Sequence, residues 1–251
     1  MFEVSADAYA RFMGRFSRPL GELFLAEVDL RRGQRVLDVG CGSGVLTAAL
    51  VDRLGEASVA AVDPSSSFVA TVREQFPDVD VRLASAEDLP FDDASFDAVL
   101  AQLVVHFMND PIGGIAEMAR TAVPGGTVAA SVWDHADDKG PLSAFWAAVK
   151  TIDPTAQDES NLRGVRDGQL AEMFRQAGLR DVTASSLTVR VHHQTFDEWW
   201  DPFTLGVGPA GAYVASLDDA ARDRLRQTCY DQMPQAPFDT MATAWTAFAV
   251  K

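Results

Sequence analysis

The sequence of 251 residues predicts an α/β fold built on a mostly parallel sheet. Short apolar segments alternate with helical segments of about ten residues, which is typical of strand–helix–strand units with parallel strands. A glycine cluster directly follows the first apolar segment, as at the ligand-binding edge of such sheets. Hydrophobic residues make up 47% of the chain, enough for a substantial core.

Each element follows from local periodicity and from its stop signals. Residues 6–28 have apolar side chains at near-helical spacing, and Gly14 and Pro19 predict a division into two helices. Strands are expected at 35–39, 58–62, 79–83, 96–102, 127–132, 182–191 and 243–250. Helices are expected at 47–54, 66–75, 112–122 and 169–176.

We expect one domain over residues 1–251. Leader helices occupy residues 1–30, and the ligand-binding core occupies residues 33–134. Two aromatic insertions, at 139–166 and 196–238, are interpreted as a helical cap on one sheet edge. The terminal strands, at 182–191 and 243–250, flank the second insertion.

The charge balance excludes several partners. Lys and Arg number 21 against 36 Asp and Glu, so the net charge is −15, which disfavours nucleic acid and anionic membranes as partners.

No apolar run reaches the length of about 18 residues that spans a bilayer, and the N-terminus lacks a signal-peptide pattern. Cys41 and Cys229 make no disulfide framework, and no Cys/His cluster predicts a metal site. We expect a cytoplasmic monomer or homodimer.

The loop at residues 40–44 carries the chemistry. Its three glycines allow a ligand to approach the backbone, and Asp38 precedes them inside the strand. Asp63 follows Gly44 by 19 residues, a spacing at which an acid reaches a ribose diol. Asp38 suits a ligand with sulfonium and ammonium charges, although it could also anchor the turn. A nicotinamide oxidoreductase is an alternative, but Val45 stands where its third glycine would be.

Five motifs follow one another within residues 36–132. They are VLDVGCGSG at 36–44, AVDPS at 61–65, ASAEDLPFDDASFDAV at 84–99, LVVHFMNDP at 103–111 and EMARTAVPGG at 117–126. In this order they resemble the class I S-adenosylmethionine-dependent methyltransferases, most of all the subgroup of ubiquinone/menaquinone-biosynthesis C-methyltransferases. The segment at 9–19, YARFMGRFSRP, also resembles a leader helix of this group.

The resemblance implies a Rossmann-like, seven-stranded sheet with an antiparallel last strand and helices on both faces. It also implies S-adenosylmethionine as cofactor and S-adenosylhomocysteine as product. The residues implied to hold the methionine end are Asp38, Gly40, Cys41, Gly42, Gly44, Gln102 and Leu103. Those implied to hold the nucleoside are Asp63, Pro64, Ser65, Ser85, Ala86 and Glu87. Ser85 departs from the Asp of many relatives, which leaves the adenine amino contact open. By its chemistry Arg15 could pair with the cofactor carboxylate, with Ser17 adding a hydrogen bond, or it could be a surface residue. Tyr9 could close over the sulfonium or the substrate, or pack in the core.

We expect methyl transfer to a small apolar or aromatic molecule. Because the sulfonium methyl group is already activated, the protein mainly aligns the reactants. His106 is the candidate general base, and its alternative role is a buried structural histidine. The candidate substrate contacts, which could instead be packing residues, are Phe12, His106, Trp133, Trp146, Trp199, Trp200 and Tyr213. A protein of this fold that binds the cofactor without methylating, such as a cyclase or a binding module, is a further alternative.

Overall fold

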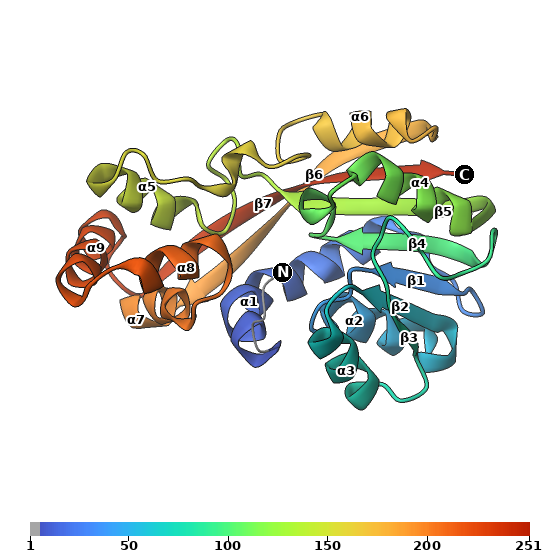
Figure 1. Cartoon of the computed structure of the whole chain (residues 1–251), viewed down its shortest axis with the longest axis horizontal. Helices are drawn as coiled ribbons and strands as arrows, with labels where there is room; N and C mark the ends of the chain where they lie inside the picture. Colours follow the sequence, from blue (N-terminus) through green and yellow to red (C-terminus); the bar gives the residue numbers. More distant parts are fainter. Residues whose placement is uncertain (1–5) are drawn as a thin grey trace.

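A seven-stranded sheet runs through the molecule in the order β3-β2-β1-β4-β5-β7-β6 (Figure 1). The computed structural model describes residues 6–251, with side chains from residue 11 onward. The strands are β1 (Val36–Val39), β2 (Val59–Asp63), β3 (Asp80–Leu83), β4 (Phe96–Gln102), β5 (Ala122–Trp133), β6 (Arg180–His193) and β7 (Phe238–Val250). The positions confirm the strand prediction.

The strand directions confirm the mostly parallel sheet and its antiparallel last strand. Strands β1 to β5 pair in parallel, while β7 is antiparallel to both β5 and β6. Strand β5 begins before the predicted residue 127. The Gly125 amide donates to the Lys251 carbonyl, and the Lys251 amide donates to the Gly126 carbonyl, so this segment is paired with the chain end rather than free.

Helices cover both faces of the sheet (Figure 1). One apolar cluster joins the sheet to α1 (Ala6–Glu27), α2 (Val45–Leu54) and α3 (Ser66–Gln75). A second cluster joins its other face to α4 (Pro111–Thr121) and α6 (Gln169–Gln176). The sheet is therefore the shared wall of two cores, as a doubly wound fold requires.

Helix α1 is continuous, so the predicted division at Gly14 and Pro19 is wrong. Pro19 removes one backbone donor and costs on the order of 3 kcal/mol inside a helix. The stripe of Phe12, Phe16, Leu20 and Phe24 is at most 5% exposed. Burial of each such side chain contributes about 1.5–3 kcal/mol, so packing of the whole stripe outweighs the local cost of the proline.

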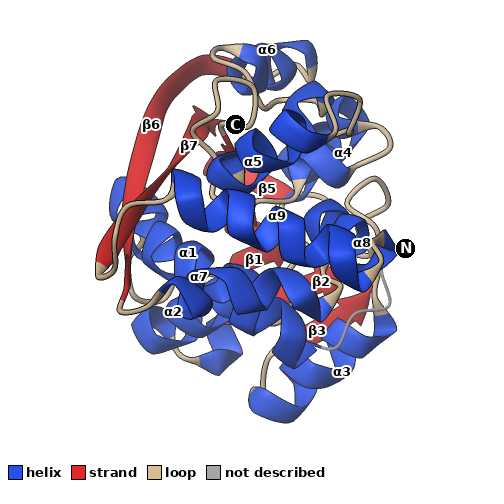
Figure 2. Ribbon diagram, turned by 90° about the vertical axis from the view of Figure 1, so that its left-hand side faces the viewer, coloured by secondary structure: helices blue, strands red, loops and turns tan. Residues whose placement is uncertain are grey.

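The two aromatic insertions lie together at one end of the sheet (Figures 1 and 2). The first contains α5 (Ser143–Ile152), and the second contains α7 (Phe196–Trp200), α8 (Gly208–Ser216) and α9 (Asp219–Gln232). Phe203, in a short 3₁₀ helix after α7, stacks on Phe145 of α5 with ring centroids 4.4 Å apart. Phe203 also contacts Phe12 of α1 edge-on at 5.3 Å. We call these insertions the cap.

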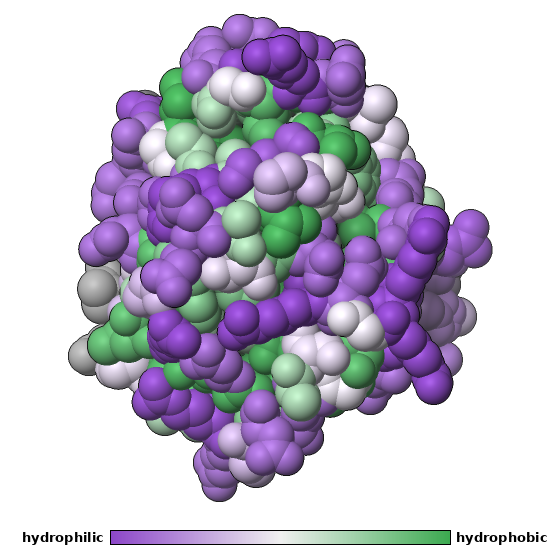
Figure 3. All heavy atoms as spheres, turned by 90° about the vertical axis from the view of Figure 1, so that its right-hand side faces the viewer, coloured by the Kyte–Doolittle hydropathy of each residue, from purple (hydrophilic) through white to green (hydrophobic). Residues whose placement is uncertain are grey.

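The end of the molecule away from the cap presents mostly polar residues with smaller apolar areas between them (Figure 3). Among the described residues, no helix is long and apolar enough to span a bilayer. The described part also lacks any group of three or more His, Cys, Asp or Glu side chains arranged to hold a metal ion. Cys41 and Cys229 are both buried free thiols.

Candidate functional site

Three polar side chains project from the carboxyl ends of neighbouring strands onto the same face of the sheet. Successive side chains of a strand alternate between its faces. Asp38 therefore lies on the same face of the sheet as Val36, and Asp63 lies on the same face as Ala61. Val36 and Ala61 belong to the apolar cluster that includes α1 to α3, so both carboxylates are on that face. Gln102 ends β4 on that same side. The sheet thus gathers at one edge residues that are far apart in the sequence.

The loop between β1 and α2 turns sharply in front of these residues. Gly40 has φ +72°, and a Cβ atom there would lie 2.3 Å from Cγ2 of Val104. The Gly40 and Cys41 amides donate to the carbonyl of Val62 at 2.8 and 2.9 Å, which ties the loop to β2. At Gly42, by contrast, a Cβ would meet no atom within 4 Å. Open space therefore lies directly over the backbone at the middle of the loop.

Asp38 is a buried carboxylate with one side-chain donor. It is 1% exposed, and its Oδ2 accepts a hydrogen bond of 2.6 Å from the Thr47 hydroxyl of α2. Burial raises the pKa of Asp38 to about 7, the Thr47 hydroxyl opposes this rise, and the nearby Asp63 adds to it. A cation beside Asp38 would restore its charged form, because opposite charges favour ionisation.

Asp63 orders the glycine loop. Its Oδ2 accepts from the Gly42 amide at 2.9 Å and its Oδ1 from the Ser65 amide at 2.8 Å. Burial raises the pKa of Asp63, and these two amides oppose the rise. A carboxylate has about four acceptor positions, so Asp63 retains capacity for two further donors such as ribose hydroxyls. Pro64, beside it, is exposed.

Helix α1 closes the site beside β4. The Gln102 side-chain amide donates to the carbonyl of Ser17 at 2.6 Å. Gln102 Oε1 and Ser17 Oγ are buried without a hydrogen-bond partner, and so is Ser43 Oγ in the glycine loop. Leu103 leaves β4 with φ +63°, a conformation uncommon for a residue with a Cβ. Its amide donates to the Ser131 carbonyl, which secures this turn.

These features fit a ligand with a cation at one end and a diol at the other. Unpartnered buried polar atoms are costly unless a ligand or water satisfies them. The loop region combines such atoms with two buried carboxylates, whose pKa values burial raises, and with open backbone at Gly42. These polar groups therefore suit a ligand in which an amino-acid group is joined to a nucleoside.

The segment after β3 contains the residues predicted to line the adenine, Ser85, Ala86 and Glu87. Glu87 Oε1 accepts from the Asn109 amide at 2.9 Å and from the Asp110 amide at 3.4 Å, so it holds the start of α4. Ala86 is buried and Ser85 is half-buried. Their adenine contacts stay predictions.

Comparisons with known proteins agree with this geometry. The family model described as "Methyltransferase domain" matches residues 37–130. Over this region the chain is similar to the class I S-adenosylmethionine-dependent methyltransferases. Its matched region is the part that carries the glycine loop, Asp38 and Asp63.

Similar proteins include an uncharacterized methyltransferase of Mycobacterium tuberculosis, 41% identical over 106 residues. That match covers 42% of this chain and 42% of the relative, so the chain spans under half of its length. A demethylmenaquinone methyltransferase of Shouchella clausii is 29% identical over 65% of this chain and 78% of its own. The solved structure of YcgJ from Bacillus subtilis has a TM-score of 0.60 at 21% identity, covering 92% and 97%.

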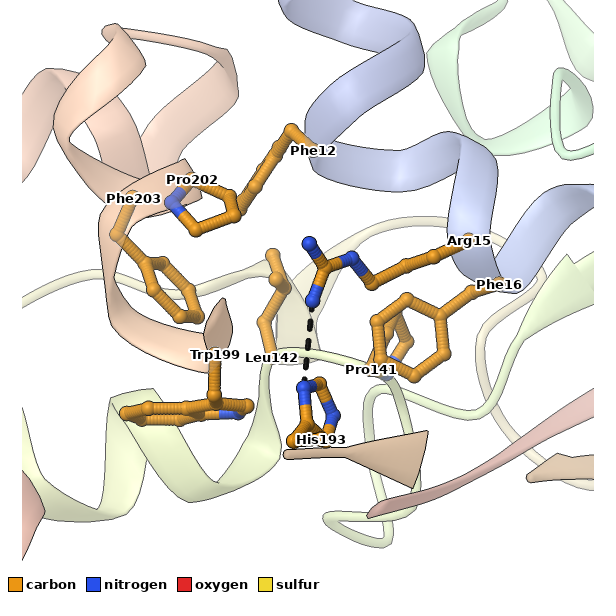
Figure 4. Close-up of a pocket in the computed structure, with 9 residues that line it drawn as sticks. All are labelled: Phe12, Arg15, Phe16, Pro141, Leu142, His193, Trp199, Pro202 and Phe203. Atoms are coloured by element: carbon orange, nitrogen blue, oxygen red, sulfur yellow. Dashed lines mark hydrogen bonds between the residues drawn. The ribbon is translucent and has the colours of Figure 1, made fainter. Parts of the chain in front are cut away.

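A small cavity also lies between α1 and the cap (Figure 4). It measures about 10 Å³, and Phe12, Arg15 and Trp199 line it together with His193 and Phe203. The guanidinium of Arg15, which the sequence predicts at the cofactor, lines this cavity in the structure, and its contact with the cofactor stays a prediction. His193 and Phe203 were missed as lining residues. The only available signal was their position in and beside the aromatic insertion.

His106 lies in the 3₁₀ helix Val105–Phe107, directly after the turn at Leu103. It is 6% exposed, and its Nδ1 has no hydrogen-bond partner. Burial lowers the pKa of His106 to about 3, and the neighbouring His135 adds to this effect. The side chain is therefore a neutral imidazole at neutral pH.

Some of the rings predicted to contact the substrate line small cavities, and the others pack against neighbouring rings. Phe12 and Trp199 reach the cavity beside Arg15. Trp146 lines a second small cavity with His135 and Glu159. The remaining rings are packed: Trp133 against Phe16, Trp200 against Phe203, and Tyr213 against Trp146. The side chain of Tyr9 lies outside the described residues.

Proposed function

We propose that the chain transfers a methyl group from S-adenosylmethionine to a small molecule. The observation that carries this proposal is the pair of buried carboxylates, Asp38 and Asp63, that flank an open glycine loop at adjacent strand ends. A family match over the same residues supports it. When bound, the cofactor supplies a methyl group activated by a positively charged sulfur.

The residues of the loop would hold the two ends of the cofactor. Asp38 would accept from the ammonium group, and Asp63 would accept from the ribose hydroxyls, since charge-assisted bonds of this kind are strong. The unpartnered Ser43, Ser17 and Gln102 oxygens would receive or share further donors. Backbone at Gly42 would lie closest to the ligand, because a Cβ there would meet no atom within 4 Å.

The acceptor molecule would lie between α1 and the cap. Aromatic side chains from both elements face one another there, and such rings favour an apolar or aromatic ligand. His106 stands at the neighbouring strand end, but a group with a pKa of about 3 is a weak base at neutral pH. The proposed function therefore rests on alignment of the reactants, with no obligatory proton transfer to His106.

Calorimetry with S-adenosylhomocysteine, S-adenosylmethionine and NADH tests the cofactor. We expect wild-type protein to bind the two adenosyl compounds and Asp63→Asn to lose about tenfold or more in affinity, as expected for loss of charge-assisted bonds. Asp52→Asn, at an exposed position of α2, is the matched control and keeps wild-type affinity. Selective binding of NADH would overturn the proposal.

Methyl transfer itself needs a second measurement. Small-molecule extracts are incubated with the protein and with cofactor whose methyl group is isotopically labelled, and the products are analysed by mass spectrometry. We expect a labelled small molecule whose appearance requires the wild-type protein. Binding of the cofactor without any labelled product across extracts would instead identify a cyclase or a binding module.

A further inference from the structure

Arg15 is a half-buried cation that lines an apolar cavity between α1 and the cap. Its Nη1 donates to the Glu198 carbonyl at 2.7 Å and lies 3.3 Å from Nδ1 of His193. Within the described part of the chain, no Asp or Glu side chain forms an ion pair with Arg15. The carboxylate of Glu198 accepts from the Gln194 amide through its Oε2, and its charge raises the pKa of Arg15 without an ion pair to it.

His193 adds no negative charge to this site. It is fully buried, and its Nε2 lies 2.9 Å from the Thr240 hydroxyl. Burial and the adjacent Arg15 lower the pKa of His193 to about 4. The imidazole is therefore neutral at neutral pH, and its Nδ1 can accept from Arg15. Two neutral acceptors thus share one nitrogen of the guanidinium, while its Nε and Nη2 donors remain for another group.

The surroundings of Arg15 are apolar. Phe12, Phe16 and Leu142 line the cavity with Trp199 and Phe203, and they come from α1, from the segment before α5 and from the cap (Figure 4). Partial burial lowers the pKa of Arg15, and the charge of Glu198 opposes this effect. A guanidinium in such surroundings binds a carboxylate strongly, because its planar fork matches both carboxylate oxygens.

Arg15 also points away from the cofactor loop. Ser17 on the same helix contacts Gln102 at the end of β4. Residues two apart on a helix project in directions that differ by about 200°, so Arg15 faces the cap while Ser17 faces the strand ends. The charge therefore serves a ligand on the cap side of α1.

We propose that Arg15 binds the carboxylate of the acceptor substrate, which is a small organic acid with an apolar or aromatic body. This inference rests on the proposed function and adds the substrate class to it. The carboxylate would pair with the free Nε and Nη2 donors, and the body of the substrate would contact the rings of Phe12, Trp199 and Phe203. In this pairing the carboxylate is a recognition group.

Entry of such an acid requires the cap to separate from α1. A cavity of about 10 Å³ holds little more than one water molecule. Its walls belong to separate elements, so a small displacement of the segment 199–203 from α1 enlarges it. The Arg15 to Glu198 hydrogen bond is one of the contacts that such a displacement would break.

Matched acid and amide probes test the proposal. The pairs are benzoate with benzamide, phenylacetate with phenylacetamide, and 4-hydroxycinnamate with its amide. Each is titrated into protein saturated with S-adenosylhomocysteine, and binding is followed by tryptophan fluorescence and calorimetry. We expect at least one acid to bind about tenfold or more tightly than its amide. No such preference in any of the three pairs would overturn the proposal.

Variants assign the preference to Arg15. We expect Arg15→Gln to abolish the preference for the acid and Arg15→Lys to keep part of it, because lysine retains the charge without the fork. Arg18→Gln removes a charge at an exposed position of the same helix and keeps the wild-type preference. Tight acid binding that survives in Arg15→Gln would contradict the proposal.

The same variants separate this proposal from the proposed function. Arg15→Gln should leave the affinity for S-adenosylhomocysteine within about twofold of wild type. A loss of about tenfold in that affinity would place Arg15 at the cofactor and overturn the substrate assignment. If wild-type protein fails to bind S-adenosylhomocysteine at all, the proposed function fails. The preference of the cofactor-free protein for the acid over the amide is measured separately and tests Arg15 alone.

Discussion

Asp38 and Arg15 show how burial gives single residues their character. Asp38 loses solvent and retains one side-chain donor, so its carboxylate is partly neutral at pH 7. Arg15 keeps its charge, because a guanidinium deprotonates only far above neutral pH. One residue is therefore prepared to receive a cation, and the other an anion.

The pKa of Asp38 predicts a pH-dependent cofactor affinity. An ammonium group binds the ionised carboxylate, so binding below a pKa of about 7 requires release of a proton. We expect the affinity for S-adenosylhomocysteine to be roughly tenfold lower at pH 6 than at pH 8, since a carboxylate with a pKa of about 7 is about 9% ionised at pH 6 and about 91% ionised at pH 8. Calorimetry across this range measures the effect.

Thr47→Val provides the matched test of that mechanism. The Thr47 hydroxyl stabilises the charged form of Asp38, so its removal should raise the pKa and move the midpoint of the affinity curve to higher pH. Valine is close to threonine in shape, although it lacks the hydroxyl. An affinity that is flat from pH 6 to pH 8 in wild-type protein would contradict this role for Asp38.

At the scale of elements, the loop between β1 and α2 depends on close backbone packing. Gly40→Ala adds a Cβ at φ +72° and 2.3 Å from Val104, so it combines backbone strain with overlap. We expect it to lower the free energy of unfolding by about 2–5 kcal/mol, from strain of about 1–2 kcal/mol and overpacking of about 1–3 kcal/mol. Urea denaturation measures the change.

Gly33→Ala is the control for the loop prediction. Gly33 has φ +90°, but a Cβ there would meet no atom within 4 Å. Its variant should lose only the strain term of about 1–2 kcal/mol. Equal losses in the two variants would show that contact with Val104 contributes nothing.

At the scale of the whole molecule, one sheet supports two apolar clusters. Leu20 lies in the cluster on the α1 face and Ile115 in the cluster on the α4 face, and both side chains are fully buried. We expect Leu20→Ala and Ile115→Ala each to lower the free energy of unfolding by about 2–5 kcal/mol. The sites share no contact across the sheet, so the double variant should be nearly additive.

Cooperativity checks the same picture. Because the strands belong to both clusters, loss of either face exposes the other. Unfolding followed by tryptophan fluorescence and by circular dichroism should give coincident transitions in wild-type protein and in both single variants. A separate early transition for the cap tryptophans would show that the cap unfolds on its own.

The sequence by itself determined the sheet, the helices on its faces and the glycine loop. These depend on local periodicity and on turn residues, which act over a few positions. It also identified Asp38 and Asp63, because a carboxylate at a strand end is visible in the residue pattern. Continuity of α1 through Pro19 was missed, since the burial that compensates for the proline comes from distant segments.

Only the tertiary structure decided which side chains share a site. It brought Gln102 to Ser17 across 85 positions and Arg15 to His193 across 178. Such contacts depend on the order of the strands, on which face of the sheet each side chain occupies and on the direction of α1, none of which is local. Burial set the pKa values of Asp38 and His106 for the same reason, because desolvation is a property of the packed molecule.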